Sequence, residues 1–304
     1  MMNNKNENNT GNKSSQIVAV KRRAKVRGIV SGTFRHLLLA FLAVVWLVPI
    51  VWLLVTSFGI EKGINIRTFF PEAYTIKWYQ KLFTPDTVVQ FPAWFMNTLI
   101  IAIFTCIISS LFVLMVAYAT SCLRFKGRKA LMNMSVILNL FPGFLSMIAV
   151  YFILKSFNLT NSHIGLILVY SGSSGLGYLV AKGFFDTVPI ALSEAAKVEG
   201  ATKFQVFYKV VLPLSKPIIV YTIINSFLVP WMDFVYAKLI LNSGISSDWT
   251  VAIGLYNMLD RVLIKDYFAQ FCAGGVLVAI PISILFVIMQ KFYVEGITGG
   301  SVKG

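Results

Sequence analysis

The chain has 304 residues, of which 57% are hydrophobic and only 13% are charged, and its mean hydropathy is +0.75. This composition excludes an ordinary soluble domain and indicates an integral membrane protein. The formal net charge of +15 does not indicate nucleic-acid binding, because no basic stretch is interleaved with aromatic residues on a soluble face.

Six stretches are long and apolar enough to cross a membrane. A spanning helix needs about 20 mostly apolar residues, because each backbone amide must be hydrogen-bonded within the segment. The stretches predicted to span are 36–58, 97–123, 130–157, 163–185, 217–241 and 271–293. Prolines within four of them, and the small-residue run SGSSGLG in the fourth, favour helices packed against one another. We therefore expect an all-α integral membrane protein with six transmembrane helices.

The distribution of lysine and arginine predicts the orientation. Basic residues gather in 21–35, 124–129 and 182–216, whereas 59–96 and 242–270 carry both signs. Positive charge near span ends stays on the cytoplasmic side, so both termini are expected in the cytoplasm of a multi-pass bacterial plasma-membrane protein.

Three regions follow from these patterns. The predicted organisation is a disordered basic cytoplasmic tail (1–35), a six-span transmembrane domain (36–293) and a cytoplasmic C-terminal tail (294–304). The first apolar stretch begins late and is long for a signal peptide, so we expect no cleaved signal.

A polar insert, 187–217, interrupts the apolar pattern between the fourth and fifth spans. Pro189 is placed to open one helix, and Gly200 is placed to end it in a left-handed conformation. Thr202 and Gln205 have the spacing of a capping box for a second helix. The side chains expected on one face of that helix are Phe204, Phe207, Tyr208 and Val211, and Pro213 is expected to end it. The insert is therefore predicted to be a cytoplasmic helix-turn-helix.

A capped amphipathic helix pair on a membrane protein favours docking of a soluble partner over a plain connecting loop. The chain itself has no phosphate-binding loop, since no glycine is followed by lysine. It also has no cluster of histidine, cysteine and carboxylate residues with the spacing of metal ligands. Its two histidines lie at opposite predicted membrane boundaries. We therefore expect no catalytic residues, metal site or cofactor on this chain.

The segment EAAKVEGATKFQVFYKVVLPLSKP resembles the EAA motif of permease subunits in ATP-binding-cassette importers. The matching positions are Glu194, Ala195, Ala196, Gly200, Ala201, Leu212, Pro213 and Pro217. The segments FMNTLIIA, AYATSCLRFKGRKAL, VPWMDF and QKFYVEGITGGSVKG are similar to parts of the second permease subunit of maltose/maltodextrin importers. The link TSCLRFKGR departs mildly from the family's common ALARFRFRGR.

The resemblance implies a non-catalytic subunit of an oligosaccharide importer. It implies a heterodimer with a second permease, two copies of a cytoplasmic ATPase that bind ATP and Mg, and an extracytoplasmic sugar-binding protein. The residues it implies for ATPase coupling are Glu194, Ala195, Ala196, Gly200, Ala201, Phe204 and Pro213. Those it implies for contact through the C-terminal tail are Gly299, Gly300 and Lys303. Maltodextrin is the expected substrate, but the same segments also resemble galacto-oligosaccharide permeases.

Five side chains in the spans have the chemistry to contact a sugar: Asn139, Tyr170, Asn225, Trp231 and Asp233. Interhelical hydrogen bonding explains each of them equally well. Asp233, with Lys238 near the end of the same span, also leaves open a secondary transporter driven by an ion gradient. A receptor or scaffold without transport would leave the proline-broken spans and Asp233 without a role.

Overall fold

The computed structural model describes residues 32–63, 68–84, 86–140, 142–173 and 177–301, with the side chains of 139 and 293–301 left out. Two units divide the chain, 1–56 and 57–304. In the first unit, an apolar helix begins at Gly32 and reaches Ser57, the first residue of the second unit. Its 26 residues are enough to cross a bilayer, which agrees with the first predicted span.

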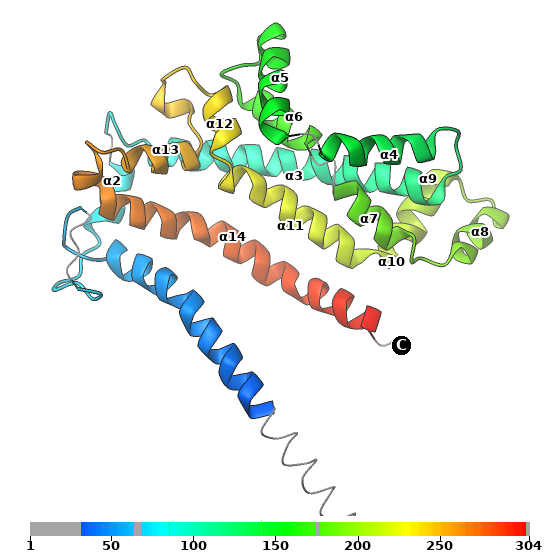
Figure 1. The fold of residues 1–304 in the computed structure, drawn as a ribbon, viewed down its shortest axis with the longest axis horizontal. Helices are drawn as coiled ribbons and strands as arrows, with labels where there is room; N and C mark the ends of the chain where they lie inside the picture. Colours follow the sequence, from blue (N-terminus) through cyan, green and yellow to red (C-terminus); the bar gives the residue numbers. More distant parts are fainter. Residues whose placement is uncertain (1–31, 64–67, 85, 141, 174–176, 302–304) are drawn as a thin grey trace, which may run out of the picture. The chain divides into compact units, whose positions relative to one another are not determined.

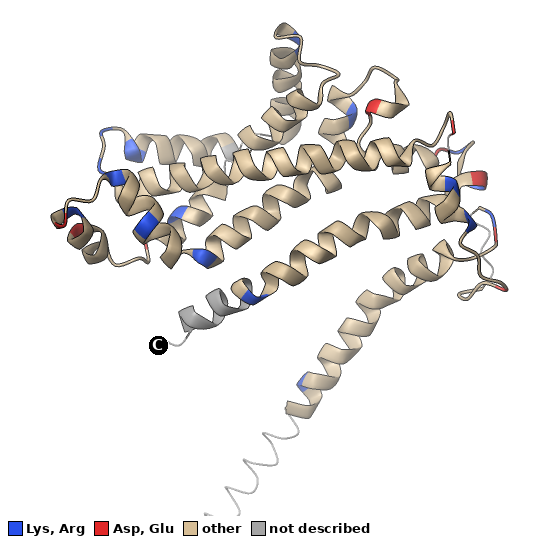
Figure 2. Cartoon of the chain, turned by 180° about the vertical axis from the view of Figure 1, so that it is seen from behind, with Lys and Arg blue, Asp and Glu red and all other residues tan. Residues whose placement is uncertain are grey.

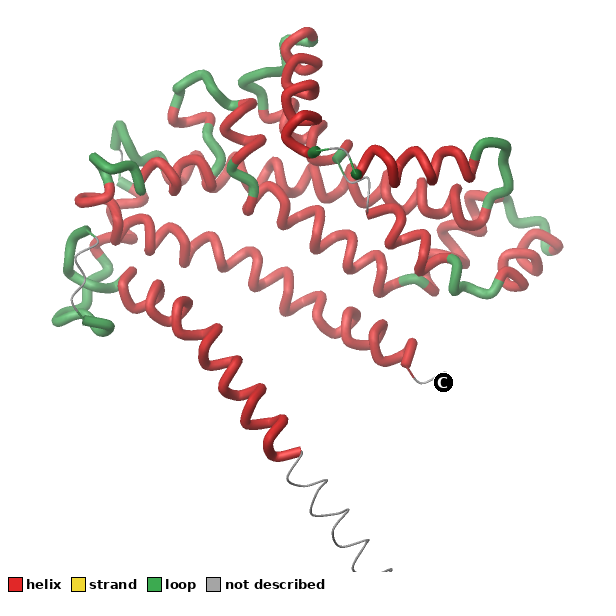
Figure 3. Tube along the Cα trace, in the orientation of Figure 1, coloured by secondary structure: helices red, strands yellow, loops and turns green. Residues whose placement is uncertain are grey.

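The second unit is helical (Figures 1 and 3). Its long helices are α3 (Phe91–Cys122), α11 (Lys216–Met232) and α14 (Ile264–Ser301). The shorter helices beside them are α2 (Lys77–Phe83), α4 (Arg128–Asn139), α5 (Gly143–Ser156), α6 (His163–Gly172), α7 (Gly177–Phe185), α12 (Val235–Ile240) and α13 (Val251–Met258). The insert forms α8 (Ile190–Val198), α9 (Lys203–Val206), η1 (Phe207–Val211) and α10 (Leu212–Leu214), and η2 (Ser246–Asp248) precedes α13.

The core of this unit lies along α3, which packs against α6, α7 and α11, while α14 packs on α11 (Figure 1). At one end of α3, buried Trp78, Phe91, Trp94 and Trp231 form an aromatic cluster. Gly254 of α13 makes room for this cluster, because a Cβ atom there would lie 2.1 Å from the ring of Trp94. A second cluster at the other end of α3 holds the insert.

The third predicted span is interrupted at a proline, and the fifth is interrupted at an aspartate. The third is broken at Pro142, so that α4 and α5 meet at 104° (Figure 3). Proline cannot donate the helical hydrogen bond and disfavours a helical residue before it, which explains the break. The fifth ends as α11 at Met232, because the Asp233 carboxylate instead accepts the amides of Tyr236 and Ala237 in the first turn of α12. The prediction of a single helix over 217–241 was therefore wrong.

Two other spans differ in detail. The fourth is divided into α6 and α7, which are inclined by 43°, on either side of the predicted small-residue run. Helix α14 begins seven residues before the predicted start at 271 and continues to Ser301, so the backbone of most of the predicted C-terminal tail is helical.

The described helices fit a multi-pass membrane protein. Three are long and apolar enough to span by themselves, and up to six spans result if each bent pair counts as one. In the second unit, charged side chains gather toward the ends of the long helices and leave their middle parts uncharged (Figure 2). This distribution is what an apolar membrane interior requires.

Candidate coupling site and substrate path

The turn of the insert is built as its sequence predicts. Gly200 has a φ of +88°, a conformation that side chains disfavour. The amide of Gly200 donates to the carbonyl of Lys197 over 3.0 Å, and that of Ala201 donates to the carbonyl of Ala196 over 2.9 Å. These two bonds form a Schellman motif, which closes the C-terminus of α8 and sets the direction of the chain into α9.

The second helix of the insert begins with the predicted capping box. The Gln205 amide donates to the Thr202 hydroxyl over 3.2 Å, and the Thr202 amide donates to the Gln205 side chain over 2.7 Å. Farther along, the Leu212 amide bonds to the carbonyl of Phe207, five residues back, which gives η1 its π-helical geometry. This shift accommodates Pro213, which lacks an amide donor. The helix therefore continues through Pro213 and ends at Leu214, one residue later than predicted.

The buried face of this helix differs from the predicted one. Val206, Phe207 and Val211 are buried against α3 and α7, whereas Phe204 is 66% exposed and Tyr208 is 42% exposed. Half of the predicted apolar face therefore points away from the core. The π-helical turn changes the angular spacing of residues after Phe207, which a regular helical repeat does not anticipate.

Tyr118 of α3 joins the transmembrane core to the insert. Its hydroxyl donates to the backbone carbonyl of Lys203 over 2.8 Å, and its ring lies 4.9 Å from that of Phe207. The insert is therefore joined to the end of α3 by a hydrogen bond and an aromatic contact.

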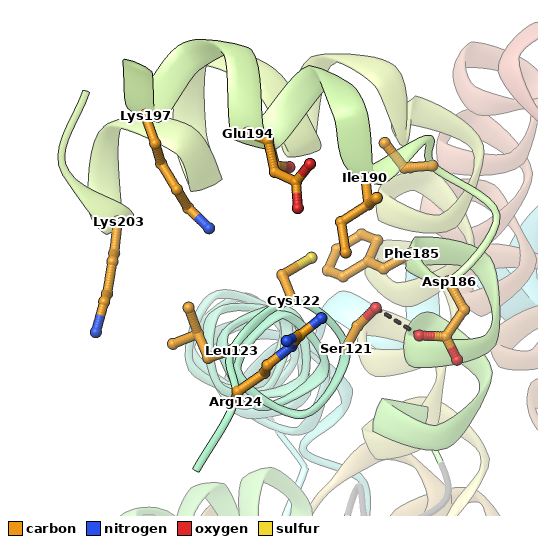
Figure 4. Close-up of a pocket in the computed structure, with 12 residues that line it drawn as sticks. Ser121, Cys122, Leu123, Arg124, Phe185, Asp186, Ile190, Glu194, Lys197 and Lys203 are labelled. Atoms are coloured by element: carbon orange, nitrogen blue, oxygen red, sulfur yellow. Dashed lines mark hydrogen bonds between the residues drawn. The ribbon is translucent and has the colours of Figure 1, made fainter. Parts of the chain in front are cut away.

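A cavity of about 590 Å³ lies between α8 and the ends of α3 and α7 (Figure 4). The Glu194 carboxylate points into it, and Lys197, Lys203 and Arg124 also line it. Glu194 is exposed and forms no ion pair with any other described residue. Its acceptor oxygens are therefore free to meet donors from outside the chain.

The wall of this coupling cavity is fixed by Asp186, which accepts hydrogen bonds from Lys182 and from Ser121, the latter over 2.6 Å. Partial burial by itself would raise the pKa of Asp186, but the bonds from Lys182 and Ser121 outweigh it and hold that pKa below its ordinary value. Asp186 is therefore an anionic link between α7 and the end of α3.

The predicted sugar-contacting residues fall into separate places. Tyr170 and Asn225 line one cavity of about 230 Å³ between α3, α6, α7 and α11. Trp231 is buried in the aromatic cluster, outside that cavity. Asp233 accepts the Tyr170 hydroxyl over 2.7 Å and the Ala237 amide over 3.0 Å, so its carboxylate holds α6, α11 and α12 together.

Four predicted site residues lie wholly or partly outside the described part of the chain. The side chain of Asn139, at the end of α4, lies outside the described part of the chain. Gly299 and Gly300 belong to the helical backbone of α14, and Lys303 lies outside the described residues.

The cavity lined by Tyr170 and Asn225 also contains polar residues that were not predicted to contact a sugar. Its further hydroxyl-bearing lining residues are Thr105, Ser109, Ser173, Tyr221, Thr222 and Ser226. Thr105 and Ser109 are four residues apart on α3, and Thr222 and Ser226 have the same spacing on α11. Small hydroxyl residues repeated at i and i+4 within apolar spans were the available signal, because this spacing places them on one helix face.

The broken helical spans, the long helices with uncharged middle parts and the projecting helix pair together fit an integral membrane protein. Residues 117–298 match the family described as "Binding-protein-dependent transport system inner membrane component". The chain belongs to this family, and it is the non-catalytic inner-membrane permease component of an ATP-binding-cassette transporter.

Individual relatives match over most of their length. The chain is 35% identical to the galactooligosaccharides transport system permease protein GanQ of Bacillus subtilis, covering 92% of this chain and 98% of the relative. It is 29% identical to the maltodextrin transport system permease protein MdxG of the same organism, covering 88% and 95% respectively.

The fold is also found in a crystal structure of a bacterial ABC transporter involved in the import of the acidic polysaccharide alginate. The TM-score is 0.72 at 21% identity, with 87% of this chain and 96% of that chain covered. This structural similarity shows that the two proteins share a fold.

Proposed function

We propose that this chain is one permease subunit of an importer for neutral hexose oligosaccharides. The observation that carries the proposal is the similarity to GanQ and MdxG over nearly the whole chain, since both are named as oligosaccharide permeases. Maltodextrins and galacto-oligosaccharides are the two candidate substrates. The higher identity to GanQ favours the second, whereas the sequence motifs resemble the maltodextrin type.

The cavity between α3, α6, α7 and α11 supports a sugar path. Its side chains offer hydroxyl and amide groups, which match the donors and acceptors of a sugar, and none of the described residues that line it is charged. The Thr105 hydroxyl in this cavity is buried and has no hydrogen-bond partner among the described residues. A buried polar group of this kind is stabilised when a ligand or water meets it.

The proposed complex contains a second permease, two ATPase copies that bind ATP and Mg, and a sugar-binding protein outside the cell. The ATPase pair would contact the coupling cavity through Glu194, and the C-terminal tail would add a contact through Gly299, Gly300 and Lys303. Both termini would then lie in the cytoplasm, which agrees with the basic segments there.

An ion-driven transporter is less well supported. The carboxylate of Asp233 is occupied by the Tyr170 hydroxyl and by two amides at the start of α12, as expected for a structural cap. A coupling carboxylate instead has to exchange its partners during transport.

The experiment is uptake of radiolabelled maltotriose and β-galactotriose into vesicles containing the full complex. We expect ATP-dependent uptake of at least one sugar, and none with this chain alone. Uptake by the isolated chain on a proton or sodium gradient, lost in Asp233→Asn, would contradict the proposal.

A further inference from the structure

A second polar cavity lies at the opposite end of the bundle from the insert. It has a volume of about 370 Å³ and is formed by the segment after the first helix, by α2 with the loop that follows it, and by the start of α14. We call it the α2–α14 pocket, and its lining residues are Lys62, Lys81, Thr84, Asp86, Asp266, Tyr267 and Gln270. It shares no lining residue with the substrate cavity described above.

Gln270 is the residue that marks this pocket as a site. It is only 3% exposed, yet it lines the pocket. Its side-chain amide carries two donors and an acceptor, which are available to molecules that enter the pocket. The amide therefore indicates a hydrogen-bonding ligand or water in the pocket.

The charges around the pocket restrict the ligand. The ammonium groups of Lys62 and Lys81 repel a cation. The carboxylates of Asp86 and Asp266 repel an anion. None of these four side chains forms an ion pair with another described residue. The lining thus presents separate donors and acceptors to a molecule without net charge, as in sites that bind several hydroxyl groups.

Size and position favour a sugar ring. The volume falls within the range of pockets for small ligands, which begins at about 300 Å³. Tyr267 adds an aromatic side chain to the polar lining. The pocket belongs to segments that carry mixed charge and are expected on the outer side of the membrane.

We infer that the α2–α14 pocket binds one hexose unit of the incoming oligosaccharide on the outer side, before it enters the spans. This inference rests on the proposed function. Gln270 and Asp266 bind the sugar hydroxyl groups, and Lys81, whose amine lies 5.3 Å from the Trp78 ring centroid, is held at the rim.

The test is protection of a cysteine in the pocket. Thr84→Cys in the full complex without its binding protein is labelled with a membrane-impermeant maleimide, with and without maltotriose or β-galactotriose. At a sugar concentration ten times the dissociation constant, we expect labelling to slow by about tenfold. Ser243→Cys, in an exposed loop outside the pocket, is the matched control and should show no protection. The parental chain gives the background from Cys106, Cys122 and Cys272.

Second substitutions separate binding from folding. Gln270→Leu and Asp266→Asn, each combined with Thr84→Cys, should abolish protection, whereas Asp260→Asn outside the pocket should retain it. Because Asp266 is exposed, its variant is expected to fold even if Gln270→Leu does not.

Two results would overturn the inference. Labelling that neither sugar slows would exclude a sugar site, and protection only after adding the binding protein would identify a protein-docking surface instead. Either result, with parental sugar uptake intact, would leave the proposed function standing. Failure of the parental complex to take up either sugar would instead contradict that function.

Discussion

The hydroxyl of Tyr118 donates a 2.8 Å hydrogen bond to the backbone carbonyl of Lys203, 85 residues farther along the chain. This bond joins the end of α3 to the first residue of α9, which lies within the Thr202–Gln205 capping box. Because its acceptor is a backbone atom, the contact holds the insert whatever side chain occupies position 203. It therefore provides a direct mechanical route from the insert to the transmembrane core.

Tyr118→Phe should weaken that route while preserving the ring contact with Phe207. A part-buried hydrogen bond contributes about 1 kcal/mol, so the complex should still assemble. We expect partial uncoupling, measured as a lower ratio of sugar transported to ATP hydrolysed. Tyr208→Phe is the control, since the Tyr208 side chain is exposed. An unchanged ratio in Tyr118→Phe would show that the hydrogen bond transmits no motion.

Gly200→Val should disturb the direction of the insert. At a φ of +88°, a side chain costs about 1–2 kcal/mol, and a β-branched one is especially disfavoured. No atom within 4 Å would obstruct the new Cβ, so the effect comes from the backbone. We expect normal membrane insertion but reduced recovery of ATPase with the purified permease. Gly183→Ala, in an open helical position, should behave like the parent.

Gly254→Ala should destabilise the aromatic cluster. The added methyl group would lie 2.1 Å from the Trp94 ring, and overpacking of a core typically costs about 1–3 kcal/mol. The expected result is a lower thermal unfolding midpoint in detergent. Gly172→Ala has open space around it and serves as the control. Equal midpoints for the two variants would contradict the close packing of α13 on α3.

Asp186 should make the coupling cavity sensitive to acid. Its folded-state pKa lies below the ordinary value of 3.8, so its stabilising effect is complete above about that pH and is lost as pH falls through the folded pKa. We expect the parental complex to lose stability below pH 3.8 more steeply than Asp186→Asn, as measured by unfolding at stepwise lower pH. Parallel curves would show that the contacts with Lys182 and Ser121 stabilise nothing.

Local signals predicted the insert well because they act over a few residues. Gly200 and the Thr202–Gln205 capping box have the predicted geometry, since each depends on near neighbours. The prolines predicted irregular spans but not where the helices of the third and fifth spans end. Whether a proline kinks a helix or ends it depends on tertiary partners, such as the amides that Asp233 accepts.

The residues of the substrate cavity were predictable only in part, because their positions also depend on tertiary contacts. Tyr170 and Asn225 share a cavity, but Trp231 packs in a core that forms from α3, α11 and α14 together. The α2–α14 pocket had no sequence signal, because Lys62 and Gln270 are separated by more than two hundred residues and meet only in the fold.

The central claim is that the insert transmits the work of a separate ATPase to these spans. Glu194 is the most direct point at which to test it, because its carboxylate faces the coupling cavity and has no ion-pair partner among the described residues. Glu199→Lys is a matched control, as Glu199 is exposed on the same insert but does not line the cavity.

The decisive measurement is sugar-stimulated ATP hydrolysis by the reconstituted complex carrying parental, Glu194→Lys or Glu199→Lys permease. Charge reversal at a docking surface replaces attraction with repulsion, which costs several kcal/mol. The account predicts that Glu194→Lys abolishes stimulation, through loss of the ATPase or of coupling, while Glu199→Lys retains most of it. Full assembly and parental stimulation in Glu194→Lys would contradict the claim.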